Sequence, residues 1–227
     1  MEIYKYDTHV HTSEASGCAS STGAETALAY KEAGYDGIII TDHFFNGNSA
    51  VPRRLPWKKR IELFCKGYEN AREQGEKIGL TVLFGWEFTS DANDFLTYGL
   101  DKEWLIAHPD IMDMQIWEYA QFVRRCGGFV VQAHPFRIRD YVKKLVLIPN
   151  DVDAVEAVNL GGNDIQNERA RWYAESYDLP ITGGSDTHNV AAAPKGGILT
   201  DMPINSISDY AEAVRGGRIL KILDGKE

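Results

Sequence analysis

Hydrophobic and polar positions follow two alternating periods along the 227-residue chain. Short apolar runs of strand length recur from end to end, and stretches with helical spacing separate most of them. The strand-length runs are Ile3–Tyr6, Gly37–Thr41, Thr81–Gly85, Phe129–Ala133, Ala154–Leu160, Pro180–Gly183 and Ile198–Ile204. The helical stretches are Thr22–Gly34, Trp57–Gly79, Asp110–Cys126, Asp164–Tyr177 and Ser206–Gly216. This alternation predicts βαβ units, and therefore a parallel sheet with helices outside it.

No linker rich in Pro, Gly or Ser interrupts this succession of about seven strands. We therefore expect one α/β domain over residues 1–227, folded as a closed or nearly closed barrel. Apolar residues make up 44% of the chain and charged residues 25%, which is ordinary for a folded globular protein. The one long irregular connection is Phe44–Pro56, and long loops in compact domains are often functional.

Cysteine content, hydropathy and charge indicate in which compartment the protein works and which partners it is not expected to bind. Cys18, Cys65 and Cys126 are widely spaced and form no CxxC pair, which excludes a disulfide framework and fits a reducing compartment. The sequence has no signal-peptide pattern and no apolar run near membrane-spanning length, so we expect a cytoplasmic protein without membrane contact. A net charge of −9 argues against general nucleic-acid binding, although some acids would be neutralised if they bound cations. The oligomeric state stays open.

Five of the six histidines lie in the opening strand or just after an apolar run. The histidine segments are Asp7-Thr-His9-Val-His11, Thr-Asp42-His43, His134-Pro135 and Asp186-Thr-His188. The acid Glu87, in Trp-Glu87, follows an apolar run in the same way. In a parallel barrel the carboxyl ends of the strands converge on one mouth, and imidazole and carboxylate groups are the ligands that Zn, Mn or Fe prefer. A single His-x-His pair is more often a hydrogen-bonded core pair, but this recurrence predicts a metal site. His108 follows no strand-like run, so we expect a surface or helix-entry residue.

Other catalytic arrangements fit the sequence less well. The run from Ser185 to His188 contains the letters of a hydrolase triad, but neighbours on a strand face opposite ways and cannot form a relay. Nucleophile-elbow, dinucleotide and P-loop motifs are absent from the sequence. Metal-activated water is therefore the mechanism that remains.

This ordered set of motifs, from residue 7 to residue 188, closely resembles the PHP family, named for polymerase and histidinol phosphatase. The resemblance implies a distorted seven-stranded (β/α) barrel that hydrolyses phosphate esters with up to three divalent metal ions (Zn, Mn or Fe). By motif, it implies a first metal on His9, His11, Glu87 and Asp186, a second shared by Glu87 and His134, and a third on His43 and His188.

Two positions depart from the commonest family pattern. Asp94 stands where many members have a histidine before an apolar strand, and it is the expected substitute ligand. Many members also carry an Asp or His several residues after the His-x-His pair. Here Glu14 is the expected ligand at that place, with a solvated loop acid as the alternative, and Cys18 is expected to be no ligand.

The resemblance also suggests a mechanism. Two metals about 3.5–4 Å apart would bridge a water, lower its pKa and aim the hydroxide at phosphorus. Arg137 would balance the charge on the phosphoryl oxygens, unless it is a surface residue that begins a helix, and Asp42 would orient a ligand histidine. Arg53 and Arg54 are candidates to bind an anionic substrate, whereas Lys58, Lys59 and Arg60 are expected on a solvated helix face.

The leading hypothesis is therefore a metal-dependent phosphoesterase acting on a small phosphate monoester. Alternatives are a phosphotyrosine-protein phosphatase or a nuclease of the same family, and an inert, metal-stabilised interaction domain. Three divalent ions beside Glu14, Glu87, Asp94 and Asp186 would give the mouth a local charge of +2, which attracts phosphate. Neither the substrate nor the identity of the metals is readable from the sequence.

Overall fold

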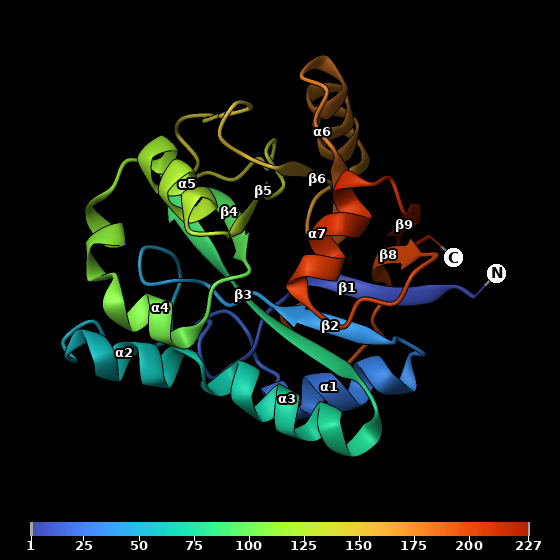
Figure 1. Cartoon of the computed structure of the whole chain (residues 1–227), viewed down its shortest axis with the longest axis horizontal. Helices are drawn as coiled ribbons and strands as arrows, with labels where there is room; N and C mark the ends of the chain where they lie inside the picture. Colours follow the sequence, from blue (N-terminus) through green and yellow to red (C-terminus); the bar gives the residue numbers. More distant parts are fainter. Residues whose placement is uncertain (1, 227) are drawn as a thin grey trace.

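A computed structural model describes residues 2–226, and its strands form one mixed sheet that curves into a nearly closed barrel (Figure 1). The strand order is β7-β6-β5-β4-β3-β2-β1-β8-β9. The strands are β1 (Tyr4–Val10), β2 (Gly37–Ile40), β3 (Thr81–Ser90), β4 (Asn93–Tyr98), β5 (Phe129–Gln132), β6 (Ala154–Asn159), β7 (Ile181–Gly184), β8 (Gly196–Thr200) and β9 (Ile219–Asp224). The barrel architecture predicted from the sequence is confirmed.

The prediction of a purely parallel sheet is wrong. Pairs β1–β2, β2–β3, β5–β6 and β6–β7 are parallel, but β3–β4, β4–β5, β1–β8 and β8–β9 are antiparallel. Three of these antiparallel pairs involve β4 or β9, two strands that the apolar pattern did not reveal, and the fourth arises because β8, expected from the run Ile198–Ile204, runs against β1. A tight turn reverses the chain into β4 at Asp91 and Ala92, which have positive φ angles of 49° and 59°.

Helices surround the sheet (Figure 1). They are α1 (Gly23–Glu32), α2 (Trp57–Phe64), α3 (Lys66–Ile78), α4 (Lys102–Ala107), η1 (Pro109–Asp113), α5 (Ile116–Arg125), α6 (Asp164–Ser176) and α7 (Ile207–Arg215). The predicted helix Trp57–Gly79 is therefore two helices, and the N-terminal part of Asp110–Cys126 is the 3-10 helix η1. A capping box begins α1, because the Thr22 hydroxyl accepts from the Glu25 amide while the Glu25 carboxylate accepts from the Thr22 amide.

The long loop after β2 is anchored in the core at its start. Phe44 and Phe45 are buried, and their rings stack at 4.4 Å and pack against Trp57 and Phe64. Burial of aromatic rings is a large apolar contribution to stability. The loop is thus fixed in the core at its beginning and again at Val51, and its exposed residues lie around that second anchor.

The seam between β1 and β7 completes the barrel. The amide of His11 donates to the Thr187 carbonyl at 2.9 Å, and the amide of Asp186 donates to the His9 carbonyl at 2.9 Å. Gly184 permits this approach, since a Cβ there would lie 2.4 Å from the His9 Cβ. The first and last motifs of the sequence are thereby brought side by side.

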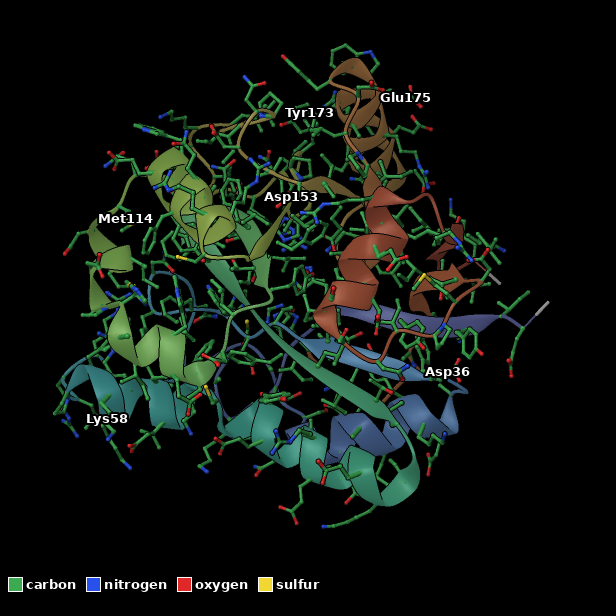
Figure 2. All side chains as sticks on the ribbon, viewed as in Figure 1. Asp36, Lys58, Met114, Asp153, Tyr173 and Glu175 are labelled. Carbon is green, nitrogen blue, oxygen red and sulfur yellow. The ribbon has the colours of Figure 1, made fainter. Side chains whose placement is uncertain are left out.

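Exposed charged side chains cover the outside of the molecule, as Figure 2 shows for Lys58 on α2. Across residues 2–226, no helix combines the length and the apolar character that crossing a membrane requires.

Candidate metal centre

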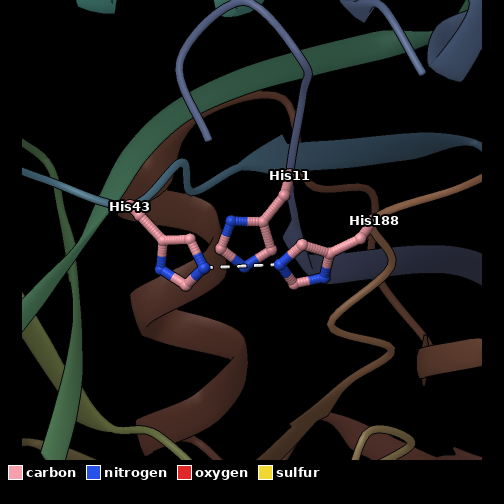
Figure 3. A group of neighbouring side chains, drawn as sticks. All are labelled: His11, His43 and His188. Atoms are coloured by element: carbon pink, nitrogen blue, oxygen red, sulfur yellow. Dashed lines mark hydrogen bonds between the residues drawn. The ribbon is translucent and has the colours of Figure 1, made fainter. Parts of the chain in front are cut away.

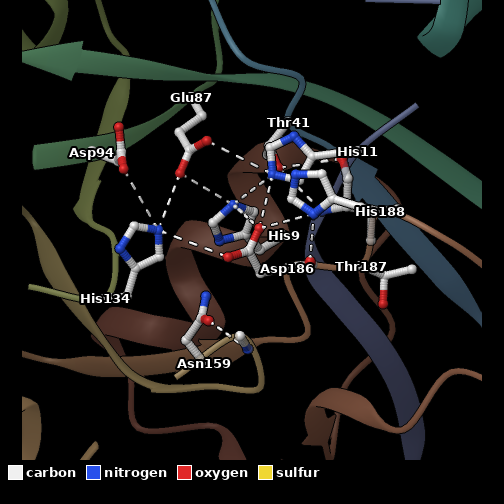
Figure 4. Close-up of polar contacts among 12 residues, drawn as sticks. His9, His11, Thr41, Glu87, Asp94, His134, Asn159, Asp186, Thr187 and His188 are labelled. Atoms are coloured by element: carbon white, nitrogen blue, oxygen red, sulfur yellow. Dashed lines mark hydrogen bonds and ion pairs between the residues drawn. The ribbon is translucent and has the colours of Figure 1, made fainter. Parts of the chain in front are cut away.

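Four buried side chains from four different strands or strand ends form what we call the inner group: His9, Glu87, His134 and Asp186 (Figure 4). The Nε2 of His9 lies 3.4 Å from Oε1 of Glu87 and 3.5 Å from Oδ1 of Asp186. The Nε2 of His134 lies 3.2 Å from the same Glu87 oxygen. Four side chains from strands that are distant in the sequence thus bring their donor atoms together in one small volume.

His43 and His188 form the outer group, nearer the solvent, with 13% and 25% of their side chains exposed. Their Nε2 atoms lie 3.3 Å apart. The His11 ring lies beside both outer histidines (Figure 3), with its centroid 4.1 Å from that of His188 and 4.3 Å from that of His43. Its Nε2 also lies 3.0 Å from Nε2 of His9 and 3.1 Å from Oδ1 of Asp186.

These residues fit divalent metal ions. A tetrahedral zinc with bonds of about 2.0–2.1 Å separates its ligand atoms by roughly 3.3 Å, which matches the distances in both groups. Three triads bring their donor atoms within 4.8 Å of one another: His9–His11–Asp186, His9–Glu87–His134 and His11–His43–His188. Furthermore, Oε2 of Glu87 and Oδ1 of Asp186 are buried and accept no well-aligned hydrogen bond from the described residues, although Nδ1 of His43 and Nε2 of His11 lie 2.5 and 3.1 Å from them. Buried carboxylate oxygens without partners are costly unless a cation neutralises them.

Burial and charge act against each other within the centre. Burial raises the pKa of the Glu87 carboxyl, but the cationic forms of His43 and His9 outweigh it and hold that pKa well below its usual value. Burial likewise disfavours a charged His43 ring, yet the Glu87 carboxylate raises its pKa to about 11. Desolvation and the neighbouring His43 lower the pKa of His11 well below its usual value. Such opposed shifts are typical of functional sites.

Asp42 lies behind the centre and reaches His11 through a serine. The Ser16 hydroxyl donates to Oδ1 of Asp42 at 2.7 Å, so its oxygen is free to accept from Nδ1 of His11 at 3.1 Å and from the amide of His43 at 2.9 Å. Asp42 also accepts from the Thr12 amide and hydroxyl, both at 2.6 Å. Asp42 therefore fixes the turn that carries His11.

Arg137 is also held at the centre. Its Nη2 donates to Asn159 at 2.9 Å and forms a close ion pair with Asp186. A Cβ at Gly161 would lie 2.7 Å from this Nη2, so a glycine is needed beside the pair. Arg137 thus lies in the site and not on the surface at the start of a helix.

The two departures from the family pattern lie in different places. The Asp94 carboxylate is 3.9 Å from Nε2 of His134 and accepts from Thr89 at 2.7 Å, which places it at the edge of the inner group. Glu14 belongs to none of the donor triads, because its carboxylate accepts from the Gly23 amide at the start of α1 and from Asn70 of α3. The structure therefore does not bring Glu14 to the centre.

Cys18 instead lies beside the outer group. Partial burial raises the pKa of its thiol, but hydrogen bonds with His188 and His43 lower that pKa to about 6. The sulfur belongs to none of the donor triads. Cys18 is thus a neighbour of the outer histidines, where sequence reasoning expected no role.

Sequence reasoning also missed Glu156 and Asn159 of β6. Glu156 is fully buried and lies 2.9 Å from Nδ1 of His9, and Asn159 connects Glu156 to Arg137. The available signal was an acid inside the apolar run Ala154–Leu160, where a charge is unexpected.

The remaining predicted residues lie away from the donor triads. Arg53 and Arg54 are exposed in the turn before α2. Lys58 and Lys59 are exposed on α2, whereas the Arg60 guanidinium stacks over the Phe45 ring at 3.9 Å. His108 ends α4 and hydrogen-bonds the Trp104 carbonyl at 2.7 Å.

Residues 164–219 match the sequence family PHP_C, described as PHP-associated. No curated protein matches the chain in sequence.

Solved structures share its fold. A Bifidobacterium adolescentis protein, named for an inferred metal-dependent phosphoesterase activity, superposes with a TM-score of 0.59 at 18% identity, covering 84% of this chain and 90% of its own. A two-domain Bacteroides vulgatus protein containing an inferred PHP-like metal-dependent phosphoesterase gives 0.68 at 17% identity, covering 96% of this chain but only 64% of its own. An amidohydrolase from Chromobacterium violaceum, with bound sulfate and no metal, gives 0.61 at 14% identity, covering 96% of this chain and 98% of its own.

At these identities the superpositions establish a shared fold. The shared fold and the PHP-associated match over residues 164–219 both agree with the family resemblance predicted from the sequence.

Proposed function

We propose that this PHP-type chain is a metal-dependent phosphoesterase that hydrolyses small phosphate esters. The observation that carries the proposal is the convergence of three donor triads, built from imidazoles and carboxylates, beside Arg137, with two buried carboxylate oxygens that accept no well-aligned hydrogen bond. Two of the structural relatives are named for this activity, and the sulfate bound to a third is a tetrahedral oxyanion like phosphate.

The inner group and His11 would hold two divalent ions, and the outer group with His11 would hold a third. When bound, such ions would supply positive charge to the phosphoryl oxygens and lower the pKa of a water molecule. Counting three divalent ions, the Arg137 guanidinium and the carboxylates of Glu87, Asp94, Glu156 and Asp186, the centre would carry a net charge of +3. This charge favours an anionic substrate although the whole chain is acidic.

The chain's own residues have distinct tasks in this scheme. Arg137 is held by Asn159 close to the donor atoms, where its guanidinium would bind a phosphoryl oxygen and stabilise the charge that develops there. Asp42, through Ser16, requires Nδ1 of His11 to donate, so Nε2 of His11 keeps its lone pair for a metal. These contacts hold the site in place before substrate binds, which reduces the cost of ordering it.

A direct test is hydrolysis of p-nitrophenyl phosphate and of a panel of nucleotide and sugar phosphates by protein loaded separately with Zn²⁺, Mn²⁺ and Fe²⁺. The expected result is phosphate release that requires metal and is absent from a Glu87→Gln variant of unchanged fold. A p-nitroanilide substrate serves as a parallel arm, because one structural relative is an amidohydrolase. Metal-loaded protein that cleaves the anilide and no phosphate ester contradicts the proposal.

A further inference from the structure

Glu156 is a buried acid in the middle of β6, inside the barrel, and its side chain is fully shielded from solvent. Its Oε1 lies 2.9 Å from Nδ1 of His9. Its Oε2 accepts from the backbone amide of His134 at 3.0 Å and from Nδ2 of Asn159 at 2.9 Å. Both carboxylate oxygens are thus satisfied, and each contacts a different histidine of the inner group.

The contact with His9 decides which ring nitrogen is available to a metal. A carboxylate only accepts hydrogen bonds, so Nδ1 of His9 must carry the proton that it shares with Glu156. The lone pair of a neutral His9 ring is then on Nε2, the atom that faces Glu87 and Asp186 at 3.4 and 3.5 Å. The same arrangement of carboxylate, histidine and metal recurs in metalloproteins and raises the basicity of the ligand.

The contact with His134 fixes a backbone segment. His134 has a positive φ of 26°, which is unfavourable for a residue with a side chain. The hydrogen bond from its amide to Glu156 holds this conformation, in which Nε2 of His134 faces Glu87 at 3.2 Å. One carboxylate therefore positions both histidines of the His9–Glu87–His134 triad.

The packing around Glu156 leaves it little freedom. A Cβ at Gly184 would lie 2.8 Å from Oε1 of Glu156, so β7 approaches the carboxylate closely from one side. On the other side Asn159 joins it to Arg137 through hydrogen bonds at 2.9 Å. The side chain is thus held in a single orientation relative to its neighbours.

We propose that Glu156 is a positioning residue for the inner metal ions, because it selects Nε2 as the metal-binding nitrogen of His9 and holds the backbone of His134 in its strained conformation. This inference rests on the proposed function in that it concerns the same centre. It assigns Glu156 no contact with substrate.

The Glu156→Gln variant tests the proposal without changing the size of the side chain. Two donors, the amides of His134 and Asn159, face the position of Oε2, so the glutamine oxygen takes that place. The glutamine NH₂ group must then face Nδ1 of His9 and donate to it. A neutral His9 ring is thereby driven to carry its proton on Nε2, where it blocks metal binding.

The expected result is a loss of roughly 10–100-fold in zinc affinity at the inner group, as for other outer partners of metal ligands. Isothermal titration and metal content measure it. The readout specific to positioning is ¹⁵N NMR of the His9 ring. Zinc-loaded wild type should show a protonated Nδ1 and a metal-bound Nε2, and these signals should be lost in Glu156→Gln at equal zinc concentration.

Asp153→Asn is the matched control. Asp153 immediately precedes β6 (Figure 2) and forms ion pairs with Arg124 and Arg215 away from the donor triads. It undergoes the same change from carboxylate to amide, and it should leave zinc affinity and the His9 signals unchanged.

Wild-type zinc affinity and unchanged His9 signals in a folded Glu156→Gln would overturn the inference. Should that variant fail to fold, the wild type alone decides, because a zinc-loaded His9 that binds metal through Nδ1 also overturns it. Failure of the proposed function looks different. Wild type would then bind zinc through Nε2 of His9, as inferred here, yet hydrolyse no phosphate ester.

Discussion

The inner group combines imidazoles with carboxylates in the buried interior, whereas the outer group consists of two imidazoles nearer the solvent. Glu87 and His9 of the inner group are fully buried, and His9 is held through its second nitrogen by a buried carboxylate. In the outer group His188 is a quarter exposed, and its Nδ1 is held by the backbone carbonyl of Asp186 at 2.8 Å. Charged partners in a low-dielectric interior orient a ligand more firmly than a neutral carbonyl near solvent. We therefore expect tight, slowly exchanging inner ions and a labile outer ion.

The largest effect should come from Glu87, which touches the inner group and also His43 of the outer group. It lies 2.5 Å from Nδ1 of His43 as well as close to His9 and His134. Glu87→Gln should lose metal from both groups and reduce phosphatase activity by more than the roughly 100-fold that losing an outer partner costs. Metal content and kcat/KM measure this. A variant that keeps three metals and more than a tenth of the activity would show that Glu87 does not join the two groups.

His188→Ala should separate the two groups. Its removal leaves the inner donors intact, so the variant should lose one metal equivalent and retain the inner ions. Timed exposure of the wild type to a chelator, followed by metal analysis, should remove the same equivalent first. Release of the inner ions before the outer one would contradict the expectation that the inner ions are bound more tightly.

Arg137→Ala should reduce kcat/KM without removing metal ions from the centre. Loss of a charged hydrogen bond to phosphate costs about 1.5–3 kcal/mol, which is roughly 10–100-fold in kcat/KM. Steady-state kinetics on the best phosphate ester measure it. The exposed Arg53 provides the comparison, and Arg53→Ala should raise KM by a smaller factor. An unchanged KM in Arg53→Ala would show that Arg53 does not contact the substrate. Equal effects of the two variants would contradict a specific contact between Arg137 and the phosphoryl group.

The smallest effect on the centre should come from Glu14, an expected ligand that the structure places at the start of α1. Glu14→Gln should keep full metal content and activity. It should lose only about 0.3–1 kcal/mol of stability, because a carboxylate at a helix N-terminus is stabilising. Thermal unfolding and metal analysis are the measurements. Loss of one metal equivalent would return Glu14 to the ligand set.

The contrast between Glu14 and the histidines shows what a sequence reveals. Candidate ligands such as His43 and His134 come within three residues of the end of an apolar strand, and the geometry of a barrel then brings them together. Glu14 and Cys18 lie in a turn whose path depends on tertiary contacts, among them Gly17 to Asn48 and Ser20 to His188. No local pattern predicts which side chain of such a turn points inward.

A similar limit applies inside the sheet. Glu156 lies within a run that the sequence marks as an apolar strand. A hydrophobic pattern indicates which face of a strand is buried, but it does not show which residue a single buried charge contacts. The strand β4 was missed because its sequence, Asn93–Tyr98, begins with two polar residues and follows a turn in positive φ. The barrel and the convergence of the histidines with Glu87 and Asp186 were thus predictable, whereas strand direction, the place of Glu14 and the residues behind the donor triads depended on packing.

The seam between β1 and β7 has a consequence for how the protein unfolds. His9 and Asp186 are 177 residues apart in the sequence, so their meeting closes most of the chain into one loop. An ion held by both acts as a cross-link across a very long loop. Such a link is absent from the unfolded chain and forms late in folding, so in the proposed enzyme bound metal should slow unfolding far more than it accelerates folding.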